Sequence, residues 1–188
     1  MADGSQTSGE YRFPVSFYAA TFTRKGRQIR EILPLGTVVR VSMLECRVST
    51  PTEVNFGDVQ YSGRSGAELA RLTYPLIVSC SQTRNFINTN INVQWRAISG
   101  IDGAPGRLAL RQGGGYITGS IDGVTPAGTC DSLGGILFDN TPLKIGQIGN
   151  NQNSQTINKQ VTWRLCSGGA SLPDGPVDAA AELLVTFN

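Results

Sequence analysis

At 188 residues, the chain is long enough for one domain with a sizeable core, and its net charge of +2 is too small to predict a nucleic-acid or membrane surface. Glycine contributes 23 residues and charged residues only 16%, which is typical of a turn-rich β protein. No apolar run approaches the ~20 residues of a membrane-spanning helix. The first five residues are polar and form no signal peptide, so we interpret Met1 as a mature start, although a cytosolic protein would begin in the same way.

The amino-terminal part of the chain alternates between apolar and polar residues from Tyr11 onward, which predicts a strand. One face of this strand would carry Phe13, Val15, Phe17, Ala19 and Thr21. Such a strand could add itself to the sheet edge of another molecule. Alternatively, residues 11–43 form an ordinary hairpin of the same domain. We therefore expect residues 1–22 to be an arm and candidate donor strand, and residues 23–188 to be the main domain, with the assignment of 23–45 left open.

Short apolar stretches separated by turn residues follow along the rest of the chain, and this spacing predicts a β-sandwich. A single helical turn is conceivable at residues 66–71, and no other stretch favours a helix. The predicted strands are Glu53–Val59, Thr73–Ser79, Ile91–Ala97, Arg107–Gln112, Tyr116–Ile121, Gly135–Phe138, Thr141–Ile148, Thr156–Leu165 and the carboxyl tail.

Four cysteines favour an oxidising compartment. None lies in a C-x-x-C pair and the chain has no histidine, so a zinc site is improbable. Of the three possible pairings we favour the sequential one, Cys46 with Cys80 and Cys130 with Cys166. Each bond would close a loop of about 35 residues, worth roughly 4 kcal/mol in the chain-entropy model. Four buried free thiols are the alternative.

The carboxyl tail has the longest alternation in the sequence. After Gly175, the fourteenth residue from the end, every second residue is apolar. These residues are Val177, Ala179, Ala181, Leu183, Val185 and Phe187, and only Asn188 follows them. Because chain ends usually fray unless something holds them, a terminal strand patterned this regularly indicates an edge strand made to be paired.

Enzymatic readings find little support. The absence of histidine removes the usual general base and the commonest metal ligand. Asp178 and Glu182 are four residues apart on the predicted tail strand, so we expect both on its solvated face. Gly113–Gly115 lacks the Lys-Ser/Thr of a phosphate-binding loop and is more typical of a turn. We therefore expect no catalytic residues, no metal and no cofactor.

Aromatic and basic residues also have structural explanations. Trp95 and Trp163 each lie in an alternating run, which favours core packing over ligand stacking. The basic cluster Arg24, Lys25, Arg27 and Arg30 is explained equally well by an exposed hairpin and by a binding patch.

The chain resembles a pilin subunit, or pilin domain, of the bacterial chaperone–usher pathway. The resemblance rests on the tail from Gly175 to Phe187, on a block with Val54-Asn-Phe-Gly57 between Cys46 and Cys80, and on the strand Thr162–Leu165 just before the tail. These features cover about residues 46–188. The tail is the most specific of them.

The resemblance implies an all-β fold, an incomplete immunoglobulin-like sandwich that a donor strand completes. It implies a groove flanked by Gly175, Val177, Ala179, Ala181, Leu183, Val185, Phe187 and Asn188, whose terminal carboxylate a chaperone would bind. The implied partners are a periplasmic pilus chaperone, an outer-membrane usher and neighbouring pilins, with a host glycan or protein receptor as a further candidate. The implied location is a surface fimbrium of a Gram-negative bacterium, reached through the periplasm.

Two features depart from the family pattern. The first cysteine is preceded by 45 residues, where the family usually has fewer, and the extra length could be a strand folded onto the pilin domain or the end of a preceding adhesin domain. The Cys130/Cys166 pair is not general in the family and suggests a minor, adaptor or tip subunit. The expected function is thus a structural pilus subunit that polymerises by donor-strand exchange. The alternatives are the pilin domain of a carbohydrate-binding tip adhesin and an unrelated secreted β-sandwich enzyme.

Overall fold

The computed structural model describes residues 9–23, 26–41, 43–83, 86–131, 134–169 and 175–188, and these residues form strands, turns and loops without a helix. No described segment is therefore a helix that could cross a membrane. The strands are β1 (Gly9–Arg12), β2 (Phe17–Thr23), β3 (Gly26–Leu33), β4 (Val38–Val41), β5 (Leu44–Ser49), β6 (Glu68–Gln82), β7 (Thr89–Ala97), β8 (Leu108–Ala109), β9 (Gly115–Ile121), β10 (Leu143–Ile148), β11 (Ser154–Ser167) and β12 (Ala181–Phe187).

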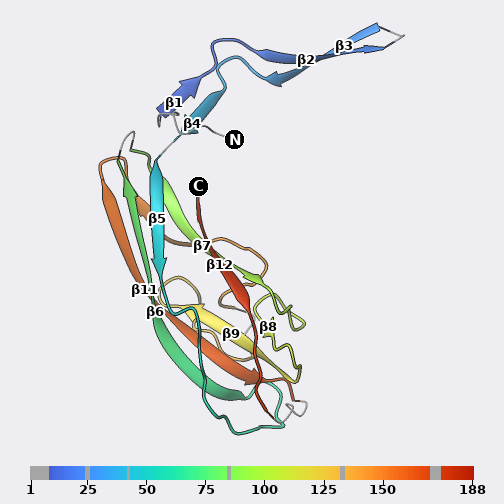
Figure 1. Cartoon of the computed structure of the whole chain (residues 1–188), viewed down its shortest axis with the longest axis vertical. Coiled ribbons are helices and arrows are strands. Elements are labelled where there is room, and N and C mark those ends of the chain that lie inside the picture. The colour runs from blue at the N-terminus through green and yellow to red at the C-terminus, as the bar shows by residue number, and fades with distance from the viewer. Residues whose placement is uncertain (1–8, 24–25, 42, 84–85, 132–133, 170–174) are drawn as a thin grey trace.

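Two antiparallel sheets form the body of the molecule (Figure 1). One has five strands in the order β5-β6-β11-β9-β8, and the other has three in the order β10-β7-β12. Alternation along β6 shows why the sheets pack together: Leu76, Val78 and Cys80 are buried, whereas Ser79 and Ser81, on either side of Cys80, are exposed. The buried side chains of both sheets join in one core. The predicted fold class, an all-β incomplete immunoglobulin-like sandwich, is confirmed.

Two predicted strands are not strands in the structure. Within Glu53–Val59 the Asn55 side chain accepts a hydrogen bond from the Gly57 amide at 2.8 Å, and Gly57 has a φ of +70°. This local turn interrupts the extended backbone. Within Gly135–Phe138 the amides of Ile136 and Phe138 donate to Gly119 and Pro105, so the segment forms no continuous ladder with a single neighbour.

Other boundaries also moved. β6 begins at Glu68, inside the stretch where a helical turn was conceivable, because its pairing with β11 continues over that length. The predicted strand Arg107–Gln112 shrinks to β8, two residues long. A turn explains the shortening, since the Gly113 amide donates to the Leu110 carbonyl and the chain reverses there.

Both disulfides follow the sequential pairing. Cys46–Cys80 joins directly opposite residues of β5 and β6, and Cys130–Cys166 ties the loop after β9 to the end of β11. The second bond belongs to a small buried cluster with Tyr116, whose hydroxyl donates to the Cys130 carbonyl at 2.8 Å. The two bonds therefore fix different regions of the five-stranded sheet and the loop beside it.

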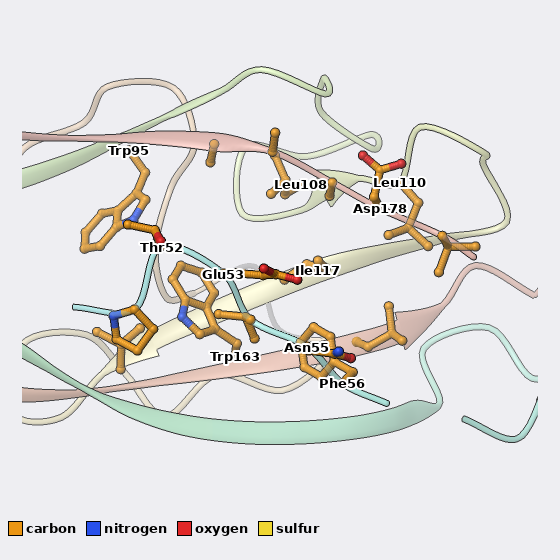
Figure 2. A pocket seen from close by; sticks show the side chains of 18 of the residues that line it. Thr52, Glu53, Asn55, Phe56, Trp95, Leu108, Leu110, Ile117, Trp163 and Asp178 are labelled. Carbon is orange, nitrogen blue, oxygen red and sulfur yellow. The ribbon is translucent and has the colours of Figure 1, made fainter. Parts of the chain in front are cut away.

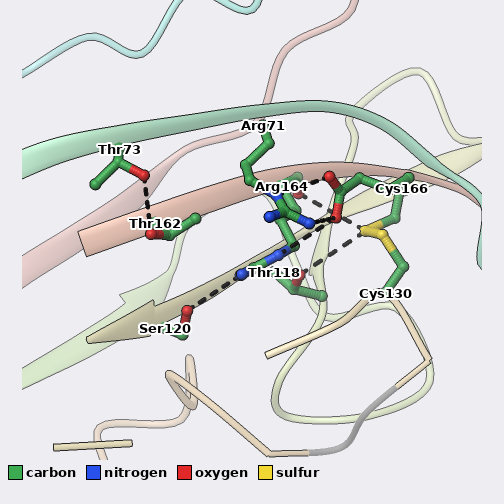
Figure 3. Close-up of polar contacts among 9 residues, drawn as sticks. Arg71, Thr73, Thr118, Ser120, Cys130, Thr162, Arg164 and Cys166 are labelled. Atoms are coloured by element: carbon green, nitrogen blue, oxygen red, sulfur yellow. Dashed lines mark hydrogen bonds and ion pairs between the residues drawn. A yellow bond between two sulfur atoms is a disulfide. The ribbon is translucent and has the colours of Figure 1, made fainter. Parts of the chain in front are cut away.

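A buried arginine lies near the second disulfide (Figure 3). Arg164 on β11 donates from its Nη1 to the Ser120 hydroxyl at 3.1 Å, and its Nε lies 3.4 Å from the Glu68 carboxylate. Burial lowers the pKa of Arg164, and the neighbouring charge of Arg71 lowers it further, whereas Glu68 raises it. Glu68 therefore supplies the negative charge that this buried cation requires.

The amino-terminal segment forms an arm that projects beyond the end of the sandwich where the carboxyl terminus also lies (Figure 1). We define the arm as residues 9–41. It consists of two successive two-stranded ribbons, β1 with β4 and β2 with β3. Residues 23–45, whose assignment the sequence left open, contribute β3 and β4 to the arm and the start of β5 to the sandwich.

Gly119 is a sensitive point of the core because it lies directly opposite Trp163 in the β9–β11 pairing. A Cβ atom there would come within 2.5 Å of Trp163 Cζ3 and 2.8 Å of Ile136 Cδ1. We expect Gly119→Ala to lower the free energy of unfolding by about 1–3 kcal/mol through overpacking, measured by urea denaturation. Gly134→Ala is the matched control, because its Cβ would meet only Pro126 at 3.6 Å. Equal effects of the two changes would contradict this account.

Candidate functional site

A groove of about 1510 Å³ opens beside the carboxyl-terminal strand (Figure 2). One wall runs from Gly175 into β12, and the other is the segment from Thr50 to Val59 that follows β5. Core side chains from both sheets form the floor. They are Leu76, Trp95, Leu108, Leu110, Ile117, Phe138, Val161, Trp163 and Leu165. The groove therefore reaches directly into the hydrophobic core.

Strand β12 is the open edge of the three-stranded sheet, because among the described strands it pairs only with β7. The amides of Asn90 and Asn188 donate to each other's carbonyls, which makes this a hydrogen-bonded pair. Because such pairs alternate along an antiparallel ladder, Thr186, Leu184 and Glu182 also bond to β7. The backbone N–H and C=O groups of the alternate residues therefore point to the open side. These residues are Ala181, Leu183, Val185 and Phe187.

The same tail residues carry apolar side chains. Ala179, Ala181, Leu183 and Val185 are partly buried against the core. Of the residues predicted to flank a groove, Gly175, Val177, Ala179, Ala181 and Leu183 line it, whereas Val185, Phe187 and Asn188 lie beyond its lining. One row of residues thus presents both an apolar surface and unpaired backbone groups.

The stretch before β12 is held in place from its outer side. The amide of Arg111 donates to the Asp178 carbonyl at 2.9 Å, and Arg111 Nη1 forms an ion pair with the Asp178 carboxylate. Glu182 pairs with Arg96 at 2.5 Å. These two acids were expected on the solvated face. Each pairs with an arginine, and Asp178, although exposed, also lines the groove. The ion pairs are about half exposed, so we attribute positioning rather than much stability to them.

The end of the tail is also fixed to β7. The backbone oxygen of Asn188 accepts hydrogen bonds from the Asn90 amide at 2.9 Å and from the Thr89 hydroxyl at 3.0 Å. The Asn92 side-chain amide donates to the Asn188 side-chain oxygen at 3.0 Å. The wall is therefore ordered over its whole length although one edge is open.

The sequence did not predict that the segment from Thr50 to Val59 forms the opposite wall of the groove. Val54, Phe56 and Val59 are half-buried toward the groove, whereas Glu53 and Asp58 are exposed. This segment belongs to no described sheet. Its apolar spacing was visible in the sequence, but the turn at Asn55–Gly57 prevents the strand that this spacing predicted.

Aromatic rings form the centre of the floor. The rings of Trp95 and Trp163 meet edge to face at 6.3 Å, and Phe138 stacks on Trp163 at 6.4 Å. Trp95 comes from the three-stranded sheet and Trp163 from the five-stranded sheet, so the contact joins the two layers. The core packing predicted for both tryptophans is confirmed.

The residues predicted as a donor strand lie outside the groove, in the arm. The run from Phe13 to Thr21 is not one extended strand, because a bend at Pro14 and Val15 separates β1 from β2. The rings of Phe13 and Phe17 contact edge to face across this bend at 5.3 Å. Ser16 fixes the bend by accepting the Leu35 amide at 2.8 Å.

The geometry of the groove is suited to an extended chain. An open strand edge beside an apolar cleft matches the recognition mode in which a peptide adds a strand to a sheet. Among the described residues no group of three acids or cysteines could hold a metal ion. The charged residues that line the groove are Glu53, Asp58 and Asp178, all acidic.

No protein-family model matches the chain, and no curated protein matches it. Solved structures are similar to it, and two of them illustrate the degree of likeness. The crystal structure of the P pilus rod subunit PapA has a TM-score of 0.47 at 13% identity, covering 76% of this chain and 99% of that chain. The crystal structure of the CupB6 tip adhesin from Pseudomonas aeruginosa has a TM-score of 0.49 at 17% identity. The match covers 78% of this chain and 44% of the CupB6 chain. Both similarities concern the fold alone.

The open edge predicts a periodic pattern of amide hydrogen exchange along β12. The amides of Leu184 and Thr186 bond to β7 and should exchange slowly, whereas those of Leu183 and Val185 should exchange at least about tenfold faster, a difference of ~1.4 kcal/mol. Exchange followed by NMR measures each amide separately. Equal protection of all four amides in the isolated chain would mean that the edge is already paired.

Proposed function

We propose that this chain is a non-enzymatic structural subunit of a surface pilus, and that a strand from another polypeptide completes its sandwich. The observation that carries the proposal is the open edge of β12 beside a groove that reaches the core. An unpaired apolar edge invites aggregation, so such an edge needs a protein partner throughout the life of the subunit. A periplasmic chaperone would cover it first, and a neighbouring subunit would replace the chaperone at the outer-membrane usher.

The energetics support a long-lived contact. Burying three or four apolar side chains at roughly 1.5–3 kcal/mol each gives about 5–10 kcal/mol before entropy costs. The new backbone hydrogen bonds add about 1 kcal/mol each. If the walls of the groove and its aromatic floor keep this arrangement in the free chain, little ordering of the acceptor opposes binding.

We further propose that the subunit is of the minor or adaptor type and that residues 11–21 supply a donor strand. The long arm and the second disulfide, Cys130–Cys166, both depart from the pattern expected of an abundant rod pilin. Location on a Gram-negative cell surface, reached through the periplasm, agrees with the two disulfides.

The groove itself can be tested with a peptide. A synthetic peptide of residues 11–23, added to the full chain at about 100 times its Kd, should stabilise it by ~2.7 kcal/mol and raise the Tm by roughly 5–10 °C. Co-expression with a pilus chaperone should likewise increase the soluble yield. A chain that is soluble, monomeric and unaffected by either partner would exclude an unfilled groove.

Deleting residues 1–22 tests the arm separately. If the arm is a donor, the shortened chain should keep its fold and its chaperone binding but lose polymerisation, because the groove remains and the strand is gone. Circular dichroism and electron microscopy of assembled fibres measure the two properties. Unfolding of the shortened chain would instead make the arm part of its own sandwich.

A further inference from the structure

The β2–β3 hairpin lies at the tip of the arm, away from the sandwich (Figure 1). Every residue of β3 from Gly26 to Ile32 is exposed, and the side chains of Tyr18, Ile29 and Ile32 are 60%, 51% and 60% exposed. A two-stranded hairpin is marginally stable at best in water, whereas three or more strands with an apolar face can be stable. The hairpin therefore gains stability from any further strand that pairs with it.

Strand β3 has an open edge. Among the described strands it pairs only with β2, so the backbone N–H and C=O groups of alternate β3 residues point away from the hairpin. The proposed donor role concerns residues 11–21, which include most of β2, and it does not use the β3 edge. Charged side chains on an edge strand prevent indiscriminate pairing. The charges of β3 therefore decide which strand can join it.

These charges follow a symmetric order along one face of β3. Side chains alternate along a strand, so Arg27, Ile29 and Glu31 share one face. Gln28 and Arg30 lie on the other face, and the register with β2 is regular over this length. Along the first face the charge is positive, then neutral, then negative. This order is complementary to itself when a second strand runs in the opposite direction.

We propose that the β3 edge binds the β3 edge of a second copy of this chain, antiparallel and centred on Ile29, so that two hairpins form one four-stranded sheet. The inference goes beyond the proposed function, because it uses neither β12 nor the groove. A two-fold axis, the commonest symmetry of homodimers, passes between the two Ile29 residues. Arg27 of each copy then lies opposite Glu31 of the other, and Gly26 lies opposite Ile32.

The contact around the axis combines apolar packing with ion pairs. The two Ile29 side chains lie opposite each other, and each has Ala20 of its own hairpin on its other side. An ion pair lies on either side of this apolar centre. On the second face Gln28 of each copy meets Arg30 of the other, so no like charges lie opposite each other. The interface is small, and we therefore expect weak association that salt weakens further.

Other alignments of the same two edges are less favourable. A parallel pair in register would place Arg27 beside Arg27 and Glu31 beside Glu31, and like charges directly opposite are destabilising. An antiparallel alignment that pairs Arg30 with Glu31 would bring Ile32 into the middle of the ladder. Ile32 is the extra residue of a β-bulge, and a bulge disrupts strand pairing. The alignment centred on Ile29 leaves this residue at the end.

Charge exchange in the full chain tests the pairing, measured by sedimentation velocity over a concentration series. The wild type should dimerise, and Arg27→Glu and Glu31→Arg should each raise the dissociation constant about tenfold, because each creates two like-charge contacts. An equimolar mixture of these two variants should return to within about threefold of the wild type, since their heterodimer restores both ion pairs. The double variant Arg27→Glu/Glu31→Arg should recover in the same way.

The matched control is Arg30→Glu, the same charge reversal on the other face of β3, where the residue meets the uncharged Gln28. It should change the dissociation constant by less than about threefold. A loss as large as that of Arg27→Glu would overturn the alignment centred on Ile29, and so would a mixture that does not recover. A wild type that stays monomeric at about 1 mM would overturn the inference as a whole.

A disulfide at the axis tests the register directly. In Ile29→Cys the two new thiols lie on directly opposite residues, whose Cα atoms are ~4.5–5.5 Å apart in an antiparallel pair, so oxidation should give a covalent dimer on a non-reducing gel. The control Gln28→Cys places its thiols two residues out of register, beyond the ~7 Å that a disulfide spans, and should cross-link at least about fivefold less. Both positions are exposed, so neither change alters the core. Equal cross-linking of the two variants would overturn the inference.

The outcomes separate this contact from the groove. A monomeric wild type whose Tm still rises with the 11–23 peptide would overturn this inference and leave the proposed function standing. Charge-dependent dimers in a chain that neither the peptide nor a chaperone affects would support this contact and exclude the unfilled groove.

Discussion

The structure depends on an imbalance between its two sheets. Five strands face three, so one side of the core has no strand above it, and β12 ends the smaller sheet with an unpaired edge. The residues that leave their backbone groups unpaired, Ala181, Leu183 and Val185, also direct apolar side chains to the core. One added element therefore satisfies hydrogen bonding and burial together, which makes completion of the sheet a cooperative event.

The rest of the molecule keeps this open site ordered. Arg111 and Arg96 hold the outer side of the tail, Thr89 and Asn90 hold its end, and stacked aromatic rings support the floor. The buried Arg164 and the Cys130–Cys166 bond lie in the five-stranded sheet and its loop. The buried arginine and this disulfide thus belong to the larger sheet, and the open edge to the smaller one.

Local alternation predicted what depends on short-range pattern. The alternation of the tail predicted β12 and the residues of its inward face. The alternating runs around Trp95 and Trp163 predicted core strands, because a strand buried on one face has apolar residues with a period of two. The segment 53–59 misled because one hydrogen bond, donated by the Gly57 amide to the Asn55 side-chain oxygen, outweighed its apolar spacing. The groove as a whole could not be predicted, because it depends on the pairing of strands far apart in the sequence, and local patterns carry no information about such pairing.

The arm shows the same limit. The alternation from Phe13 to Thr21 predicts a straight strand. In the structure the chain bends at Pro14, after β1 has paired with β4, which lies about 29 residues farther along the chain. Sequence alone assigned no partner to Arg27 and Arg30, since an exposed turn explained them equally well.

The Cys46–Cys80 bond has a mechanical consequence. The arm continues through Leu44 into β5, and the bond joins β5 to β6 only two residues farther on. Tension applied to the arm therefore passes through a covalent link into β6, which is paired along its length with β11, and does not peel β5 away bond by bond. Pulling on this molecule loads the middle of its larger sheet in shear.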